Sequence, residues 1–200
     1  MGREKSTDPQ YETVAEMAKQ SVSRLEEIIE NFSRLQLIEN VKPSPIILRD
    51  GLRQGINSIR RSWSRRNDIR RIQHNSDQYN MLVIADRLAL PRIMYLLLDN
   101  ALKFSDDNVD IIVDFIQHKH VRIGIRDYGI GIAPEHHKHI FEAFYQVDHG
   151  TKRKYSGLGI GLTAAQMLAE SMGTHIQVES QLGEGSFFHF TLPLANIDKV

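Results

Sequence analysis

The sequence predicts an α/β sandwich, in which helices cover one face of a mixed sheet, preceded by a long coiled-coil-like helix. Helix-like and strand-like runs alternate after residue 48. Two pairs of strand-like runs are close enough in sequence to form hairpins, 109–117 with 121–127 and 174–180 with 186–192. Before residue 40, apolar residues recur at helical spacing. We therefore expect two parts, a helix with its linker over 1–42 and one α/β domain over 43–200.

Length and composition fit one domain with a helical appendage. The chain has 200 residues, of which 41% are hydrophobic, so it can bury a sizeable core. Lysine plus arginine equals aspartate plus glutamate at 25 each, so net charge indicates no particular partner. The lack of cysteine excludes a disulfide framework and thiolate metal sites. No apolar run approaches the roughly 20 residues of a membrane span and no signal peptide is recognisable, so we expect a soluble, cytoplasmic chain, whatever sensor a longer parent protein carries.

The first long helix is expected between about residues 10 and 40. Its apolar positions step by four and three, the spacing of a coiled-coil seam, at Ala18, Val22, Leu25, Ile29 and Phe32. We favour a seam that pairs with a helix of a second copy, and the alternative is one amphipathic helix packed on its own domain. Pro43 and Pro45 stop the helix, so residues 41–45 are interpreted as a hinge.

The α/β part alternates helices with strands. Its first helix, over 48–63, carries Leu52, Ile56, Ile59 and Trp63 on one face. Asp86 is placed to cap a second helix that runs to about Ser105. The remaining predicted elements are strands over 69–74 and 81–85, the hairpin of 109–127, a short helix after Pro134, a helix over 161–172 and the closing hairpin of 174–192.

Six arginines lie between Arg60 and Arg71. A basic cluster of this kind can bind nucleic acid or an acidic protein. Few aromatic residues are interleaved with it and acidic residues elsewhere balance its charge, so we favour a solvated helix end and expect no nucleic-acid partner.

Two glycine clusters flank a polar loop, Asp127-Tyr-Gly-Ile-Gly-Ile132 and Gly157-Leu-Gly-Ile-Gly-Leu162. The first follows a strand-like run and the second opens a helix. Glycines at the start of a helix let the backbone approach a ligand and direct free N–H groups at it, and phosphate is the natural guest. The spacing matches neither a P-loop nor a dinucleotide fingerprint, and for either cluster alone we favour a plain turn over a nucleotide site.

Upstream, Asn100, Lys103 and Phe104 share one helical face, at i, i+3 and i+4. An amide oxygen can ligate Mg²⁺, an ammonium can contact phosphate oxygens, and a ring can pack on a base or a sugar. Taken alone, these residues favour a surface asparagine and lysine beside a core phenylalanine.

Together the segments resemble the ATP-binding catalytic domain of bacterial sensor histidine kinases, in the gyrase–Hsp90–histidine kinase–MutL ATPase superfamily. Five segments follow the family order over about 95–193. They are DNALKFS (99–105, similar to the N box), RDYGIGI (126–132, G1 box), IFEAFYQVD (140–148, F box), SGLGIGL (156–162, G2 box) and GEGSFFHFTLP (183–193, the closing glycine motif). The resemblance implies the Bergerat type of two-layer sandwich, with ATP and Mg²⁺ as cofactors.

The resemblance also implies roles for individual residues. Asp127 would accept a hydrogen bond from the adenine amino group, and Gly129 and Gly131 would let the backbone follow the base. Asn100 would help to hold Mg²⁺, with Lys103 on the phosphates. The complete set of implied nucleotide-binding residues is Asn100, Lys103, Phe104, Asp127, Gly129, Gly131, Ile132, Lys152, Arg153, Gly157, Leu158, Gly159, Gly161 and Leu162, and the implied metal ligand is Asn100.

A lid is implied over about 145–156. Phe141 and Phe144 would anchor it. Lys152, Arg153 and Lys154 would meet phosphate when the lid closes, although ordinary solvated lid charges are an equal alternative. The reaction implied is transfer of the ATP γ-phosphoryl group to a histidine.

The implied partners come from the same family. Residues 1–42 would be the second helix of a phosphoacceptor hairpin whose first helix is absent, and this helix would form a homodimer. No histidine followed by an acidic residue precedes His74, so the acceptor-histidine helix would be another segment or chain, and a response regulator receiver domain would be the next partner.

One position departs from the family pattern. Kinases commonly carry asparagine, and hydrolysing relatives glutamate, four residues before the N-box asparagine, where this chain has Leu96. An aliphatic side chain neither ligates Mg²⁺ nor activates water. Two hypotheses follow, an active catalytic fragment of a sensor histidine kinase, or a nucleotide-binding or dimer-forming regulatory module with weak or no kinase activity. A serine kinase of the anti-sigma type and a hydrolysing ATPase are less favoured.

Overall fold

The computed structural model describes residues 41–62, 65–116, 119–147 and 159–195. The predicted dimerisation helix, Trp63 and most of the predicted lid lie outside the described residues. The boundary at 42–43 thus stays a prediction.

A five-stranded mixed sheet forms one layer of the molecule, in the order β2-β4-β5-β7-β6. β2 pairs parallel with β4, and the other neighbours are antiparallel. The strands are β2 (Ile72–Gln73), β4 (Val109–Ile116), β5 (His120–Asp127), β6 (Gln177–Gln181) and β7 (Gly185–Pro193). Both predicted hairpins are confirmed, with strand ends that differ from the prediction by at most three residues.

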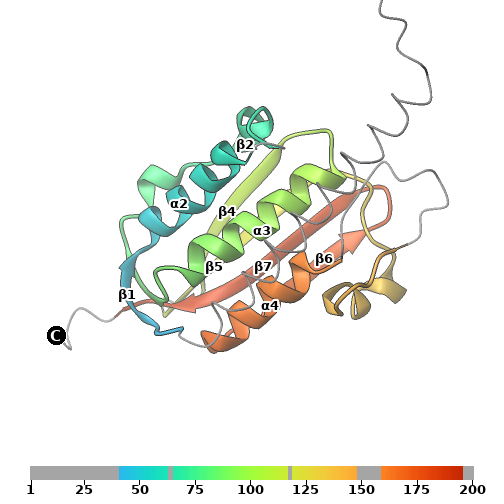
Figure 1. The fold of residues 1–200 in the computed structure, drawn as a ribbon. Coiled ribbons are helices and arrows are strands. Elements are labelled where there is room, and N and C mark those ends of the chain that lie inside the picture. Colours follow the sequence, from blue (N-terminus) through green and yellow to red (C-terminus); the bar gives the residue numbers. More distant parts are fainter. Residues whose placement is uncertain (1–40, 63–64, 117–118, 148–158, 196–200) are drawn as a thin grey trace, which may run out of the picture.

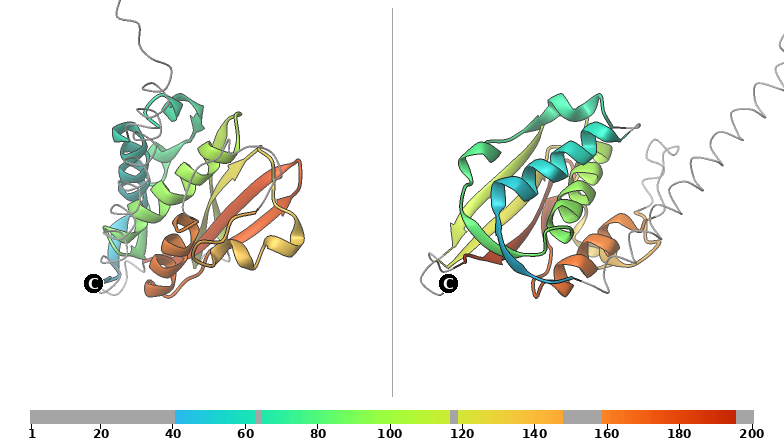
Figure 2. Two further views of the ribbon diagram at one scale, coloured as in Figure 1. Left: turned by 45° about the vertical axis from the view of Figure 1, so that its right-hand side comes forward. Right: turned by 60° about the vertical axis from the view of Figure 1, so that its left-hand side comes forward.

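Three helices form the second layer and cover one face of this sheet (Figures 1 and 2). They are α2 (Leu48–Arg61), α3 (Ala89–Phe104) and α4 (Gly161–Ser171). α3 lies centrally, and its residues from Ile93 to Leu98 are almost completely buried. The α/β sandwich expected from the sequence is confirmed.

The core lies between the two layers because side chains alternate along each strand. In β5, Val121, Ile123 and Ile125 point toward the helices and are at most 1% exposed. They pair with Leu192, Phe190 and Phe188 of β7, which are buried beside them. The alternate positions, among them Arg122 and Arg126, lie on the opposite face of the sheet.

Two glycines allow α2 and α3 to pack closely. A Cβ atom on Gly51 would lie 2.6 Å from Leu90 Cδ2, and one on Gly55 would lie 2.5 Å from Met94 Cβ. Both distances are shorter than real Cβ contacts. The side chains of Leu90 and Met94 therefore occupy notches in α2 that no other residue type would leave open.

The predicted cap of α3 is also confirmed. Asp86 Oδ1 accepts hydrogen bonds from the backbone N–H groups of Leu88 at 2.8 Å and Ala89 at 2.9 Å. These groups have no partner inside the helix, so a side-chain acceptor stabilises its first turn.

Three local predictions differ from the structure. The hinge over 41–45 contains the start of β1 (Ser44–Ile47), which pairs antiparallel with β3 (Leu82–Ala85). Proline is tolerated there because β1 has a single neighbour and needs few N–H donors. The predicted strand over 69–74 is mostly the 3₁₀ helix η2 (Asp68–Arg71), and only β2 is extended. The short helix expected after Pro134 consists of two 3₁₀ turns, η4 (Pro134–His136) and η5 (His139–Phe141).

Candidate functional site

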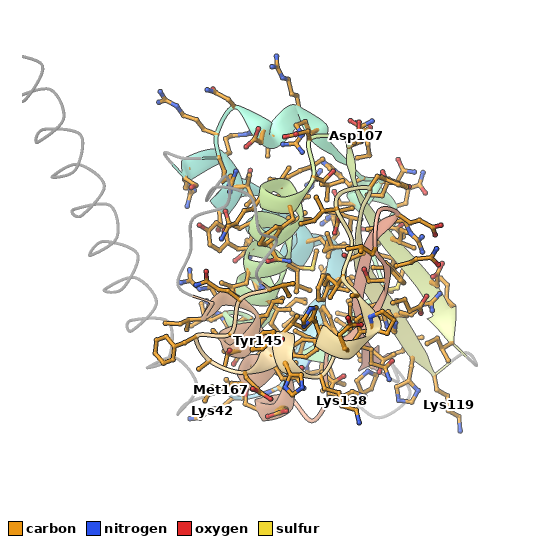
Figure 3. All side chains as sticks on the ribbon, turned by 90° about the vertical axis from the view of Figure 1, so that its right-hand side faces the viewer. Lys42, Asp107, Lys119, Lys138, Tyr145 and Met167 are labelled. Carbon is orange, nitrogen blue, oxygen red and sulfur yellow. The ribbon has the colours of Figure 1, made fainter. Side chains whose placement is uncertain are left out.

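The predicted site residues that the structure describes come from three places, the last turns of α3, the loop after β5 and the start of α4. The end of α3 and the turn between β6 and β7 lie on the same side of the molecule (Figure 1). On the view of that side, Asp107, in the turn after α3, and Tyr145, after η5, lie toward opposite ends (Figure 3).

Asp127 is the best-defined polar group of the site. It ends β5 with 3% of its surface exposed, and its Oδ1 accepts the backbone N–H of Gly129 at 2.9 Å. Burial raises the pKa of Asp127 above its ordinary value, although hydrogen bonds from Gly129 and Ser186 oppose that rise. A buried carboxylate held from two sides is an oriented hydrogen-bond acceptor that water competes for poorly.

Two glycines in the loop after β5 lie against the protein's own backbone. A Cβ atom on Gly129 would lie 2.1 Å from the carbonyl oxygen of Phe104. Gly131 has φ +65°, and a Cβ atom there would lie 1.9 Å from the carbonyl oxygen of Gln181. These glycines therefore allow the loop to pack between the end of α3 and the β6–β7 hairpin, a role that the local sequence does not reveal.

Hydrogen bonds fix this loop on both sides. Ile130 donates its N–H to the Phe104 carbonyl at 3.3 Å, and its own carbonyl accepts from Gly183 at 2.7 Å. The N–H of Ile132 donates to Ser180 Oγ at 2.9 Å. The predicted site residues Phe104 and Ile132 are thus joined through one loop.

The N-box residues occupy the last two turns of α3. Asn100, Lys103 and Phe104 are each partly exposed, and Lys103 Nζ lies 5.1 Å from the centroid of the Phe104 ring. Leu96, one turn earlier, is only 4% exposed and belongs to the apolar core. The departure at Leu96 is therefore accommodated as a core side chain and leaves no polar group at that position.

The second glycine cluster is described only in part. Gly157, Leu158, Lys152 and Arg153 lie outside the described residues, so their implied roles stay predictions. Gly159 has φ +70° and its carbonyl accepts the N–H of Phe144 at 3.0 Å.

Gly161 is the first residue of α4, and no atom of the described residues outside its own turn of the helix lies within 4 Å of where its Cβ would be. Leu162, the next residue of α4, is partly exposed. Among the described residues, the start of α4 is therefore open on the side where a side chain at Gly161 would lie.

Of the two F-box phenylalanines, one packs on the sheet and the other is exposed to solvent. Phe141 packs edge-on against Phe188, with centroids 6.4 Å apart, and so anchors η5 on the sheet. Phe144 is 70% exposed and has a positive φ of 69°. Its ring is no anchor in this structure, in contrast to the expectation, and its connection to the second glycine cluster is the backbone hydrogen bond to Gly159.

Sequence reasoning missed two serines. Ser180 Oγ accepts from Ile132, donates to the Gly185 carbonyl at 2.7 Å, and lies 3.1 Å from Ser186 Oγ. Ser186 in turn hydrogen-bonds Asp127. The closing glycine motif contains Ser186 and is the one signal that could have pointed to it.

Metal ligands are scarce in the described ranges. No group of three or more His, Asp or Glu side chains there is placed to hold a metal ion. Asp99, beside Asn100, is paired with Arg65 at 3.0 Å.

No helix of the described part is both long and apolar enough to cross a membrane.

Comparison with known families gives a match over the same region. A family model described as "Histidine kinase-, DNA gyrase B-, and HSP90-like ATPase" matches residues 85–196. The sensor histidine kinase YkoH of Bacillus subtilis is 35% identical over 111 residues, 56% of this chain and 24% of that protein. The signal transduction histidine-protein kinase BarA of Escherichia coli is 39% identical over 117 residues, 56% of this chain and 13% of that protein. The chain thus spans about a quarter or less of these relatives.

Solved structures share the fold. The full-length structure of ShkA, in complex with AMPPNP, is 25% identical, has a TM-score of 0.68, and is matched over 96% of this chain and 40% of that chain. The histidine kinase AdeS of Acinetobacter baumannii has a TM-score of 0.63 at 18% identity, over 96% of this chain and 87% of that chain.

Proposed function

Because the chain belongs to the histidine kinase-, DNA gyrase B- and HSP90-like ATPase family, we propose that it binds ATP and is the catalytic part of a two-component sensor histidine kinase. The γ-phosphoryl group would pass to a histidine on an acceptor helix that is not recognisable in this chain. A response regulator receiver domain would then take the phosphoryl group, and residues 1–42 would pair two copies.

The observation that carries the proposal is the buried carboxylate of Asp127. It fits the adenine amino group, since that group donates hydrogen bonds, whereas guanine presents a carbonyl oxygen at the same place. Its hydrogen bonds from Gly129 and Ser186 hold it in one orientation before any ligand arrives. Such preorganisation favours binding because little ordering is left to do.

The phosphate end of the nucleotide fits the other two parts of the site. The N-terminus of α4 presents backbone N–H groups, and the space beside Gly161 lets an anion approach them. Lys103, at the end of α3, supplies a cation. When bound, Mg²⁺ would neutralise phosphate charge, and Asn100 is the side chain that fits it, with phosphate oxygens and water as the remaining ligands.

The chain's own residues would contribute mainly positioning. Transfer of a phosphoryl group depends on alignment and on charge stabilisation. A neutral imidazole is itself a good nucleophile, so this domain need not supply a strong base. Leu96 fits this interpretation, because it excludes a water-activating carboxylate from the face of α3 that carries Asn100.

The same leucine favours a second candidate. With an apolar side chain at position 96, Asn100 is left as the side chain proposed to hold Mg²⁺ on this face of α3. A regulatory module that binds nucleotide, or forms a dimer, with little transfer activity would be equally compatible with that arrangement. Binding that does not depend on Mg²⁺ would favour this second function.

Calorimetric titration with a non-hydrolysable ATP analogue, with and without Mg²⁺, tests the proposal. We expect Asp127→Asn to weaken binding by about ten- to hundredfold, the effect of losing a hydrogen bond to a charged group. Asp114→Asn is the matched control, because Asp114 is a carboxylate on the neighbouring strand that pairs with Arg122 on the opposite face of the sheet. No binding by the unmodified chain would overturn the proposed function.

A further inference from the structure

Arg71, in the arginine cluster before β2, contacts the end of α3 through its whole guanidinium group. Nη2 donates to the carbonyl oxygen of Ser105 and, at 2.9 Å, to that of Asp107. Nε donates to the same Asp107 carbonyl at 3.0 Å, and Nη1 lies 3.4 Å from the Leu102 carbonyl. The side chain is 19% exposed, so these contacts are partly shielded from water.

One acceptor, the Leu102 carbonyl, belongs to the last turn of α3, and the other two, those of Ser105 and Asp107, lie just after the helix end. The last four carbonyl groups of an α-helix have no donor within the helix, and the helix dipole places partial negative charge there. α3 ends at Phe104, with Ser105 extended. A guanidinium group can bind these three carbonyls at once, because its five N–H donors lie in one rigid plane.

Two predicted nucleotide-binding residues lie between the residues that Arg71 holds. Lys103 and Phe104 follow Leu102 directly and precede Ser105. The Phe104 carbonyl in turn accepts from Ile130 in the loop that begins with Asp127. A shift of this helix end would therefore move the ammonium of Lys103 and the support of that loop together.

A second arginine of the cluster contacts the same helix. Arg65 Nε donates to Asp99 at 3.0 Å, and Asp99 is the neighbour of Asn100. Asp68, which lies between the two arginines in sequence, pairs with Arg71 at 3.3 Å and with Arg65 at 3.5 Å. The segment 65–71 is thus a brace along the last turns of α3, and part of the arginine cluster is used inside the domain.

We propose that Arg71 is a positioning residue for the nucleotide, which fixes the end of α3 so that Lys103 meets the phosphates. The proposal rests on the proposed function. It extends the site to a residue that precedes the region matched by the family model, residues 85–196. Arg71 itself need not touch the nucleotide.

The test is a double-mutant cycle on binding of a non-hydrolysable ATP analogue, measured by calorimetry with Mg²⁺ present. The variants are Arg71→Ala, Lys103→Met and the two combined. If Arg71 acts through Lys103, the loss that Arg71→Ala causes, about tenfold, falls below about threefold once Lys103 is already removed. Losses that multiply would mean general loosening of the domain, and they would overturn the proposal.

The control is Arg70→Ala, since the Arg70 side chain is exposed and makes no hydrogen bond or ion pair with the rest of the described chain. It should bind like the unmodified chain. Arg71→Lys keeps the charge but loses the planar guanidinium group. We expect its affinity for the analogue to lie between those of the unmodified chain and Arg71→Ala. If Arg71→Ala does not fold, as judged by circular dichroism, the same cycle is run with Arg71→Lys and the same criterion decides.

The two proposals fail in different ways. An unmodified chain that does not bind the analogue overturns the ATP-binding function, and the role of Arg71 with it. An unmodified chain that binds, while Arg71→Ala binds equally well, overturns the role of Arg71 alone.

Discussion

The carboxylate of Asp86 joins the start of α3 to the backbone of Lys42, whose N–H donates to Oδ2 at 2.9 Å. Its other oxygen, Oδ1, caps the helix through Leu88 and Ala89. The backbone N–H of Asp86 also points to the sulfur of Met172, just after α4, at 3.3 Å. One residue thus connects the segment that enters the domain with two helices of the proposed ATP site.

Replacing Asp86 by alanine removes the cap of α3 and the contact with Lys42. Loss of a helix cap costs about 0.5–2 kcal/mol, and we expect an unfolding free energy lower by about 2 kcal/mol in urea titration. Asp50→Ala is the matched control, because Asp50 lies in the first turn of α2, is 51% exposed and pairs only with Arg49 in the described chain. An equal loss in both variants would show that the cap does not contribute.

The contribution of Asp86 depends on pH. Burial raises the pKa of Asp86, but hydrogen bonds from Lys42, Ala89 and Leu88 more than offset this, so the net pKa lies below its ordinary value. The stabilisation is therefore complete above the unfolded pKa of about 3.9 and is lost as pH falls through the folded pKa. In acid titrations of stability, the difference between the unmodified chain and Asp86→Ala should shrink as pH falls below about 4.

The pH dependence of stability that we expect from Asp127 has the opposite sign. Because its folded pKa is raised, the folded chain keeps this proton to a higher pH than the unfolded chain does. Stability from the protonated form is lost as pH rises from the unfolded value, about 3.9, through the folded one. We expect the unfolding free energy of the unmodified chain, relative to Asp127→Asn, to fall over that range. A difference that rises with pH would contradict the burial of this carboxylate.

Leu96→Asn tests the departure in the N box. The new amide would lie where Leu96 is 4% exposed, so stability should fall by about 1–3 kcal/mol for a poorly satisfied buried polar group. We also expect binding of the ATP analogue, and any transfer to an acceptor histidine, to depend more steeply on Mg²⁺.

Leu98→Asn is the control for that variant. Leu98 is fully buried in the same helix but does not share a face with Asn100. It should lose stability without any change in Mg²⁺ dependence. If Leu96→Asn leaves the Mg²⁺ dependence unchanged as well, position 96 does not limit the metal site.

Two glycines form a matched pair for the site. Gly131→Ala places a side chain at φ +65° and against the Gln181 carbonyl. It should lower the unfolding free energy by at least about 1–3 kcal/mol, the cost of a strained backbone conformation. Gly161→Ala puts a methyl group where no described residue outside its own helix turn lies within 4 Å, and it improves helix propensity, so it should raise stability by up to about 1 kcal/mol. If phosphate approaches the amides there, Gly161→Ala nevertheless weakens ATP binding, which thermal melting and calorimetry together would reveal.

The elements that the sequence predicts well are those with a strong local period. Val121, Ile123 and Ile125 alternate with polar residues, and this alternation is enough to place β5 and to orient its two faces. The cap at Asp86 is similarly local. These features depend on neighbours a few residues away, so a single sequence contains them.

The contacts that complete the site are long-range and escape such reasoning. Gly131 is needed because Gln181, 50 residues later, lies against it, and the residue spacing contains no trace of that encounter. The role of Arg71 is equally hidden from the local sequence, because its hydrogen-bond acceptors lie more than 30 residues away. The strand β1 was missed for another reason, because prolines that end a helix are equally acceptable in a strand with one neighbour.

The notches at Gly51 and Gly55 fix the register between α2 and α3. The glycines are one turn apart, as are Leu90 and Met94, so sliding one helix by a turn, about 5.4 Å, would move one of these side chains onto a residue with a Cβ. In one direction Met94 would meet Ile59, and in the other Leu90 would meet Ile47. Slippage between the two helices is therefore disfavoured, and we expect a displacement of α2 at its junction with β1 to be passed on to α3, the helix that carries the proposed nucleotide-binding residues at its other end.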